Sequence, residues 1–102
     1  MEIENLKKII KENEVVVIKV YTNDCGVCKQ YESEFEKAKQ EFKQFKFISL
    51  DLNEKSENID FASSYGVFGV PTTLVIKNNN SGELIEGFRS FAQLSILLKN
   101  YN

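Results

Sequence analysis

The sequence lacks histidine and tryptophan altogether and contains only two cysteines, Cys25 and Cys28. A structural zinc site usually takes four cysteine or histidine ligands, so one chain does not supply a complete set. Two chains could together offer four thiolates, and that alternative stays open. We expect no metal site within one chain.

The chain also lacks a large excess of positive or negative charge. The chain carries 13 lysine and arginine residues against 15 aspartate and glutamate residues, for a formal net charge of −2. This balance provides no bulk electrostatic attraction to nucleic-acid phosphates or to anionic lipids. We therefore expect no nucleic-acid partner.

Long hydrophobic runs are missing as well. The longest, residues 15–18, is far shorter than the ~20 apolar residues that a membrane-spanning helix needs. The first residues, MEIENLKKIIKENE, mix charges of both signs and lack the basic-then-apolar order of a secretion signal. We expect a soluble, cytoplasmic protein. In that compartment a cysteine pair is more often catalytic, redox-sensing or metal-binding than a permanent cross-link.

The spacing of the apolar residues predicts an α/β fold. A length of 102 residues suits one domain, residues 1–102, and a hydrophobic share of 42% argues against disorder. Helices between the early strands imply parallel pairing, and the Asn/Ser/Gly-rich residues 77–82 imply the turn of an antiparallel hairpin. We expect a mixed sheet of about four strands with helices on both faces. The helices are expected at residues 2–13, 25–44, 56–65 and 90–100, and the strands at residues 14–22, 46–52, 72–77 and 83–88.

The two cysteines stand where a predicted strand gives way to a helix. Cys25 falls at the helix N-terminus, where unpaired backbone N–H groups favour an anion. Such a position in a Cys-X-X-Cys pair can lower a cysteine pKa from ~8.5 to 7.5 or below, and the thiolate is the nucleophile. Cys28 follows one turn later on the buried stripe of the helix. The spacing therefore predicts that Cys25 attacks a disulfide and that Cys28 resolves the mixed disulfide.

A structural disulfide is the alternative interpretation of the pair. A loop as short as residues 25–28 constrains the unfolded chain least, so the cross-link would stabilise the fold only slightly. We therefore favour a catalytic pair.

Two segments resemble the thioredoxin family, and the resemblance extends over nearly the whole chain. They are the centre Cys25–Lys29 after its strand, and Tyr65–Thr72, which is similar to the loop before the family's cis-proline. The resemblance implies a thioredoxin fold, a cis Val70–Pro71 bond and the reduction of protein disulfides. It implies no bound cofactor. It also implies that a thioredoxin reductase-type donor, ultimately driven by NADPH, returns the oxidised cysteine pair to the reduced state. We expect a monomer.

The resemblance also implies a substrate groove beside the cysteines. The backbone of Val70 would hydrogen-bond an extended substrate segment, a β-augmentation mode of recognition. An exposed Phe68 would suit an apolar docking surface, and Gly87 is similar to a family glycine beside the groove. The expected substrate-binding residues are Gly26, Val27, Phe68, Gly69, Val70, Pro71, Gly87 and Phe88.

Lys19 departs from the family pattern, because it takes the place of a buried aspartate thought to assist proton transfer at the second cysteine. Our hypothesis is that Lys19 takes over part of that role, opposed by Asp51 on the neighbouring strand, since burial pushes a lysine toward neutrality. The alternative is a lysine whose stem packs while its ammonium reaches water.

The dipeptide Gly26-Val27 is a second departure, since thioredoxins typically have Gly-Pro there and oxidising relatives carry a histidine. A histidine cation would stabilise the reduced thiolate, so its absence favours a reductant. A target-specific oxidoreductase or disulfide isomerase, and a redox-inactive adaptor with the same fold, remain as alternatives. A glutaredoxin is less favoured, because the chain lacks a Cys-Pro-Tyr-Cys centre.

Overall fold

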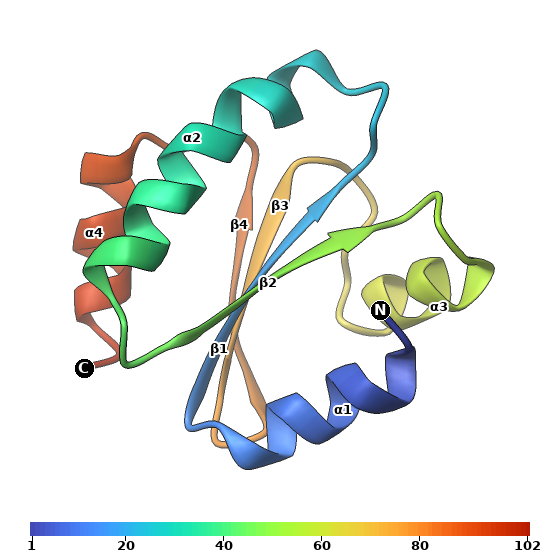
Figure 1. Ribbon diagram of the computed structural model, residues 1–102, viewed down its shortest axis with the longest axis horizontal. Helices are drawn as coiled ribbons and strands as arrows, with labels where there is room; N and C mark the ends of the chain where they lie inside the picture. The colour runs from blue at the N-terminus through green and yellow to red at the C-terminus, as the bar shows by residue number, and fades with distance from the viewer.

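The computed structural model describes residues 1–102, with the exception of the Ser81 side chain. Within these residues it has the expected α/β architecture, with four helices and a four-stranded sheet (Figure 1). The elements are α1 (Ile3–Glu12), β1 (Val15–Tyr21), α2 (Gly26–Glu41), β2 (Lys46–Asp51), α3 (Ser56–Ser64), β3 (Thr72–Lys77), β4 (Asn80–Glu86) and α4 (Phe91–Lys99).

The sheet is mixed, as predicted, with the strand order β2-β1-β3-β4. β1 runs parallel to β2 because α2 crosses over between them, and it runs antiparallel to β3. β3 in turn pairs antiparallel with β4. β1 is therefore a central strand, and six of its seven residues are buried, as its β-branched sequence predicts for a strand covered on both faces.

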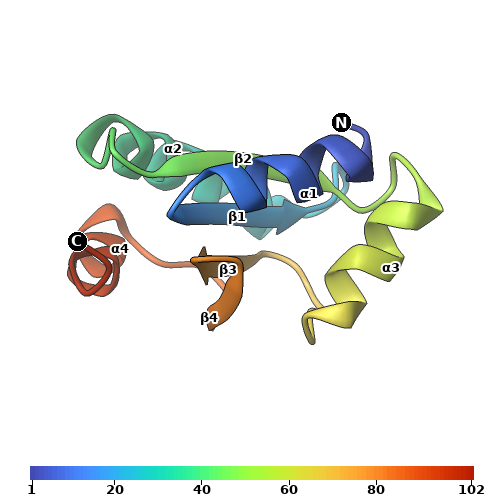
Figure 2. The same ribbon diagram turned by 90° about the horizontal axis from the view of Figure 1, so that it is seen from below.

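Helices cover both faces of the sheet, and each pair of helices has its own hydrophobic core. α1 and α3 lie on one side and α2 and α4 on the other (Figure 1), and α3 and α4 lie at opposite ends of the view in Figure 2. The side chains of alternate β1 residues pack into the two different cores. Val16 and Ile18 pack with α1 and α3, whereas Val15 and Val17 pack with α2 and α4. Lys19 belongs to the second series, so its side chain leaves the sheet on the α2 face.

The predicted start of the last strand at residue 83 is wrong, because the hairpin turn is shorter than its composition suggested. Asn78 and Asn79 have φ angles of 52° and 63°, as a two-residue hairpin turn with a left-handed conformation at both positions requires. β4 accordingly begins at Asn80. The Asn-rich run therefore contributes its later residues to the strand.

The predicted end of the long helix at residue 44 is also wrong, since α2 ends at Glu41. Phe42 leaves the helical conformation with φ −106° and ψ 63°. Its ring stacks on that of Phe45 at 5.5 Å between centroids, and both side chains are buried. The apolar spacing continues past the helix because the connection packs on the same core.

No helix in the described part of the chain is long and apolar enough to cross a membrane.

Candidate active site

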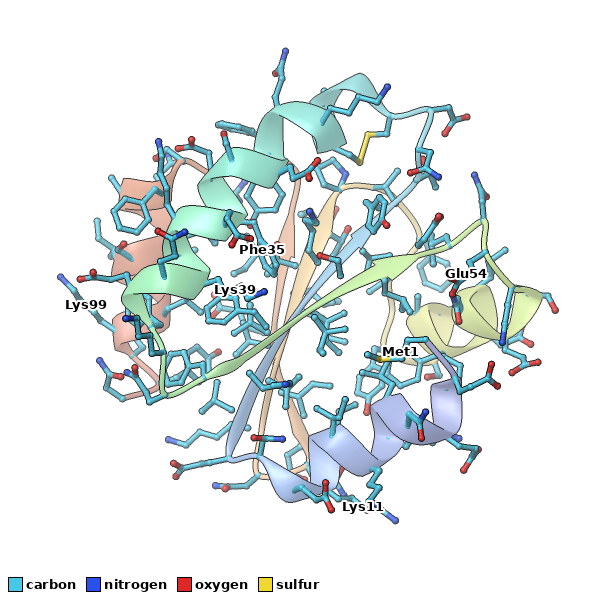
Figure 3. All side chains as sticks on the ribbon, in the orientation of Figure 1. Met1, Lys11, Phe35, Lys39, Glu54 and Lys99 are labelled. Carbon is cyan, nitrogen blue, oxygen red and sulfur yellow. A yellow bond between two sulfur atoms is a disulfide. The ribbon has the colours of Figure 1, made fainter. Side chains whose placement is uncertain are left out.

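Cys25 is the N-cap residue of α2, at the place where the chain turns from β1 into the helix. A disulfide joins Cys25 to Cys28, with 5.2 Å between their Cα atoms, and it appears in yellow at the start of α2 in Figure 3. The backbone N–H of Cys28 donates a hydrogen bond of 3.0 Å to Sγ of Cys25. The sulfur thus occupies the position in which a helix N-terminus favours a negative charge.

The two sulfurs differ in their access to solvent. Cys28 is only 3% exposed and belongs to the buried side of α2, whereas Cys25 is partly exposed. An incoming molecule therefore reaches Cys25 first. That Cys25 attacks and Cys28 follows stays a prediction.

The segment before β3 contains a cis peptide bond between Val70 and Pro71, as expected. The carbonyl oxygen of Pro71 accepts a 2.8 Å hydrogen bond from the N–H of Gly87, and Gly87 has a φ of 82°. A side chain rarely adopts this conformation, so glycine suits the position. The hydrogen bond joins two of the predicted groove residues that lie far apart in the sequence.

Three of the predicted groove side chains form exposed apolar surface. Phe68 is 84% exposed, and Val27 and Phe88 are 47% and 41% exposed. The ring of Phe88 packs edge-on against Tyr31, with 5.9 Å between centroids. A cavity of about 290 Å³ lies between the 66–69 segment and β4, and its lining includes Phe68 and Leu84.

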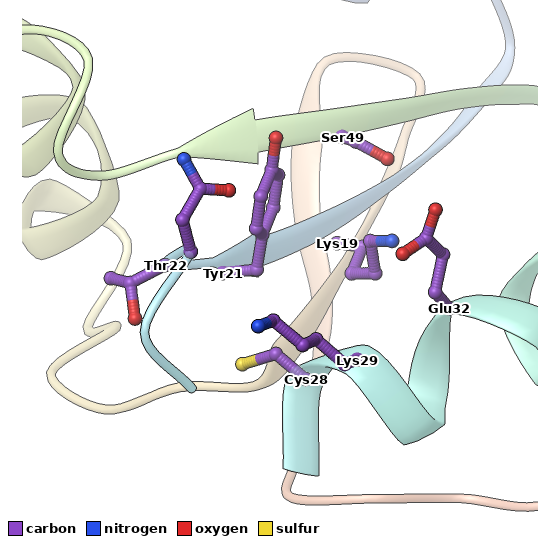
Figure 4. A pocket seen from close by; sticks show the side chains of 8 residues that line it. Lys19, Tyr21, Thr22, Cys28, Lys29, Glu32 and Ser49 are labelled. Carbon is purple, nitrogen blue, oxygen red and sulfur yellow. The ribbon is translucent and has the colours of Figure 1, made fainter. Parts of the chain in front are cut away.

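Lys19 is buried on β1, with its ammonium near the ring of the α2 residue Phe35. It is 6% exposed, and its Nζ lies 5.2 Å from the ring centroid of Tyr21 and 5.1 Å from that of Phe35. A cavity of about 300 Å³ is lined by Lys19, Cys28 and Glu32 among others (Figure 4). Burial lowers the pKa of Lys19, and the carboxylates of Glu32 and, less strongly, Glu36 oppose that shift.

A family model described as Thioredoxin matches residues 1–100. The chain belongs to the thioredoxin family. Within this thioredoxin domain, Cys25 and Cys28 form a disulfide-bonded Cys-X-X-Cys pair.

Relatives of the thioredoxin domain include short and long proteins. Thioredoxin from Mycoplasmoides gallisepticum is 29% identical over 94 residues, which cover 92% of this chain and 91% of that protein. The probable protein disulfide-isomerase A4 of Caenorhabditis elegans is 37% identical over 76 residues, or 74% of this chain, but the match spans only 12% of that protein's length. The solved structure of Plasmodium falciparum thioredoxin has a TM-score of 0.85 at 26% identity, covering 97% of this chain and 93% of that one.

The expected opposition of Lys19 by Asp51 is wrong for this thioredoxin domain. Asp51 pairs with Tyr21 in the β1–β2 register, whereas Lys19 pairs with Ser49. The carboxylates that act on Lys19 belong to α2, because odd-numbered β1 residues face that helix. The neighbouring strand therefore offers Lys19 a hydroxyl instead of a charge.

Glu32 and the pair Tyr31–Thr73 are site residues that the sequence analysis missed. Glu32 follows Cys28 by four residues, a helical spacing that places both on one side of α2 and could have been noticed. The hydroxyls of Tyr31 and Thr73 share a buried hydrogen bond of 2.7 Å. No sequence pattern indicated this contact, because it joins residues 42 positions apart.

Metal ligands do not gather at this site or elsewhere in the described residues. No group of three or more histidine, cysteine, aspartate or glutamate side chains there could hold a metal ion.

Proposed function

We propose that the protein reduces disulfide bonds in other proteins by dithiol–disulfide exchange through Cys25 and Cys28. The observation that carries this proposal is the unequal pair at the α2 N-terminus. A partly exposed sulfur accepts a backbone hydrogen bond there, and a buried sulfur stands one helical turn away.

Reduction would take place in two steps. The Cys25 thiolate attacks one sulfur of the substrate disulfide, forming a mixed disulfide, and the other substrate sulfur leaves as a thiolate that takes up a proton. Cys28 then loses its proton and attacks Sγ of Cys25. The second substrate thiolate leaves, and the two electrons gained by the substrate are balanced by formation of the Cys25–Cys28 disulfide.

The groove beside the cysteines would hold an extended substrate segment. The backbone of Val70 would pair with that segment, and the exposed ring of Phe68 would contact its apolar side chains. The exposure of Phe68, and the hydrogen bond from Gly87 to Pro71, support this assignment. The complete set of proposed contacts is Gly26, Val27, Phe68, Gly69, Val70, Pro71, Gly87 and Phe88.

Lys19 would help the proton leave Cys28 in the second step. Its burial and its place in the same cavity as Cys28 support this role. Burial lowers the pKa of Lys19, so a larger fraction of its side chain is a neutral amine, and only the neutral amine can accept a proton from the neighbouring thiol.

Residues 1–102 would act as one domain and as a monomer in the cytoplasm. A reductase of the thioredoxin-reductase type, ultimately driven by NADPH, would return two electrons to the disulfide. These assignments rest on the family membership.

Disulfide isomerisation is a second candidate, favoured by the 37% identity to a protein disulfide-isomerase over 76 residues. A redox-inactive adaptor is disfavoured by the paired cysteines at the helix end.

Reduction of insulin disulfides by dithiothreitol, followed by the turbidity of the released chains, tests the function. The wild type should accelerate the reaction, and Cys25→Ser should abolish the acceleration. Cys28→Ser should instead accumulate a mixed disulfide through Cys25, visible by mass spectrometry. Equal rates for the wild type and Cys25→Ser would refute the proposal and favour an adaptor. Recovery of activity from a scrambled disulfide protein, without net reduction, would favour the isomerase.

A further inference from the structure

A carboxylate on α2 is joined to the first backbone N–H of α4, which lies beside α2 on the same face of the sheet (Figure 1). The N–H of Phe91 donates a hydrogen bond of 2.8 Å to a side-chain oxygen of Glu34, and the two residues are 57 positions apart in the sequence. Phe91 is the first residue of α4, and an N–H group at that position has no partner within its own helix. Glu34 therefore supplies a partner from a different helix.

The surroundings of Glu34 keep its carboxylate charged. The side chain is only 19% exposed, and its second oxygen accepts a hydrogen bond of 3.4 Å from Lys37. The hydrogen bond from Phe91 is the main cause that lowers the pKa of Glu34, and Lys37 lowers it further, although partial burial opposes the shift. A negative charge also suits the positive end of the α4 dipole. The contact is thus a charge-assisted hydrogen bond, which is stronger than one between neutral groups.

This contact fixes one end of a short segment that belongs to the proposed groove. Residues 87–90 connect β4 to α4, and we call them the groove wall. At one end of the wall, the N–H of Gly87 is bonded to the carbonyl oxygen of Pro71, the residue before β3. At the other end, Phe91 is bonded to Glu34. Among the residues that the structure describes, this is the only hydrogen bond that joins the wall or Phe91 to α2.

The helix that carries Glu34 also carries the cysteine pair at its N-terminus. We propose that Glu34 is a positioning residue, which holds the groove wall at a fixed place beside α2 and thereby prepares the groove for an extended protein segment. It acts through Phe91 and the wall, without contact with the substrate. The wall side chain whose position it fixes is Phe88, which packs edge-on against Tyr31 of α2. The inference rests on the proposed function, because it assigns a role within the groove proposed there.

A small disulfide separates this positioning role from the chemistry of the sulfurs. Such a molecule has only to reach Cys25, whereas a protein disulfide also lays the chain around its cysteine into the groove. Loss of the contact that holds the wall should therefore weaken the binding of protein substrates and leave the exchange reaction itself unchanged. In kinetic terms, it should raise the substrate concentration at half-maximal rate and leave the limiting rate as it is.

Single-turnover oxidation of the pre-reduced protein tests the inference. The protein is mixed with excess insulin, the reaction is quenched by alkylation, and the oxidised fraction is measured by mass spectrometry. Glu34→Ala should raise the insulin concentration at half-maximal rate about 3–5-fold, since the change resembles the loss of a helix cap. The limiting rate, and the rate constant with bis(hydroxyethyl) disulfide, should stay within about twofold of the wild type. Glu34→Gln should stay within about twofold for insulin as well, because its amide oxygen can still accept the hydrogen bond.

Two variants control for the change of charge. Lys37→Gln removes the ion pair on the outer side of Glu34 but leaves the Phe91 N–H its partner. Glu41→Ala removes an exposed carboxylate from the last residue of α2. Neither should change the insulin concentration at half-maximal rate. A role of Glu34 in stability alone would lower the free energy of unfolding of Glu34→Ala without changing this concentration. An unchanged concentration, or an equal loss of rate with both disulfides, would overturn the inference.

Hydrogen exchange of the backbone amides judges the inference without any redox step. In Glu34→Ala the amides of Phe91 and of the groove wall should exchange faster than in the wild type, and in Lys37→Gln they should not. Glu34→Leu serves in its place if Glu34→Ala does not fold. Unchanged exchange of the wall would refute the inference even if the wild type reduces insulin. A wild type that reduces neither insulin nor the small disulfide would instead refute the proposed function, while the exchange rates still decide whether Glu34 holds the wall.

Discussion

The buried hydrogen bond between Tyr31 and Thr73 gives a stability prediction whose magnitude follows from the structure. The two hydroxyl oxygens are 2.7 Å apart, and both residues are 0% exposed. Tyr31→Phe leaves the Thr73 hydroxyl buried without this partner, and Thr73→Val does the same to the Tyr31 hydroxyl. Each single change should cost about 1–3 kcal/mol, because a stranded buried polar group loses its solvation.

The double variant should cost much less than the sum of the single changes. When both hydroxyls are replaced by apolar groups of similar shape, neither is left stranded. We expect a coupling energy of about 1–2 kcal/mol in the double-mutant cycle. Each single variant should also lower Tm by roughly 4–8 °C for every kcal/mol lost.

Urea denaturation followed by far-UV circular dichroism is the suitable assay, since the chain has no tryptophan to report unfolding by fluorescence. All four proteins of the cycle should be measured in the same redox state. Strictly additive free energies of unfolding would refute the hydrogen bond and, with it, the way in which α2 is joined to β3.

Three further predictions concern the groove, the hairpin and the C-terminus. Phe68→Ala should change stability by less than about 0.5 kcal/mol, since the side chain is 84% exposed, but it should lower kcat/KM for a protein disulfide about 3–10-fold; Ile96→Ala, which removes another exposed apolar side chain, should change neither quantity. Gly82→Ala should destabilise by about 1–3 kcal/mol in urea denaturation, because its Cβ would lie 2.8 Å from the Val75 carbonyl oxygen; Gly69→Ala, with nothing within 4 Å of its Cβ, is the neutral control. Burial and the hydrogen bond to Glu83 raise the pKa of Tyr101 from 10.0 to about 12. Because the pKa of Tyr101 is higher in the folded than in the unfolded protein, the protonated hydroxyl stabilises the fold fully below pH 10, and this stabilisation is lost between pH 10 and 12. The free energy of unfolding of Tyr101→Phe should therefore fall less than that of the wild type over this interval. An equal fall in both proteins would contradict the assignment.

Local periodicity was sufficient to predict most of the fold. The run Val15–Val20 indicated a central strand because its residues are apolar on both faces, apart from Lys19. The helix expected at residues 90–100 is Phe91–Lys99, and a capping box formed by Ser90 and Gln93 marks its start. Boundaries failed where packing competes with local pattern, as at Phe42, whose burial continues the helical spacing after the helix has ended.

The candidate site was predictable only where its residues are close in sequence. The cysteine pair could be found from one short segment, because four residues determine its chemistry. The environment of Lys19 could not be derived in the same way, because it depends on which helix covers each face of β1. Lys19 faces α2, so Glu32 and Glu36 of that helix act on it, whereas Asp51 lies two residues further along β2, beside Tyr21.

The hydrogen bond from the Cys28 N–H to the Cys25 sulfur has a consequence for how other proteins distinguish the two redox states. The sulfur of the N-cap residue Cys25 can accept this hydrogen bond both as part of a disulfide and as a thiolate. We therefore expect the first turn of α2 to stay folded in both redox states. The backbone fold would then be almost the same in the oxidised and the reduced protein. An electron donor must recognise that state at the surface immediately around Cys25, and binding elsewhere on the molecule would be equally strong before and after electron transfer.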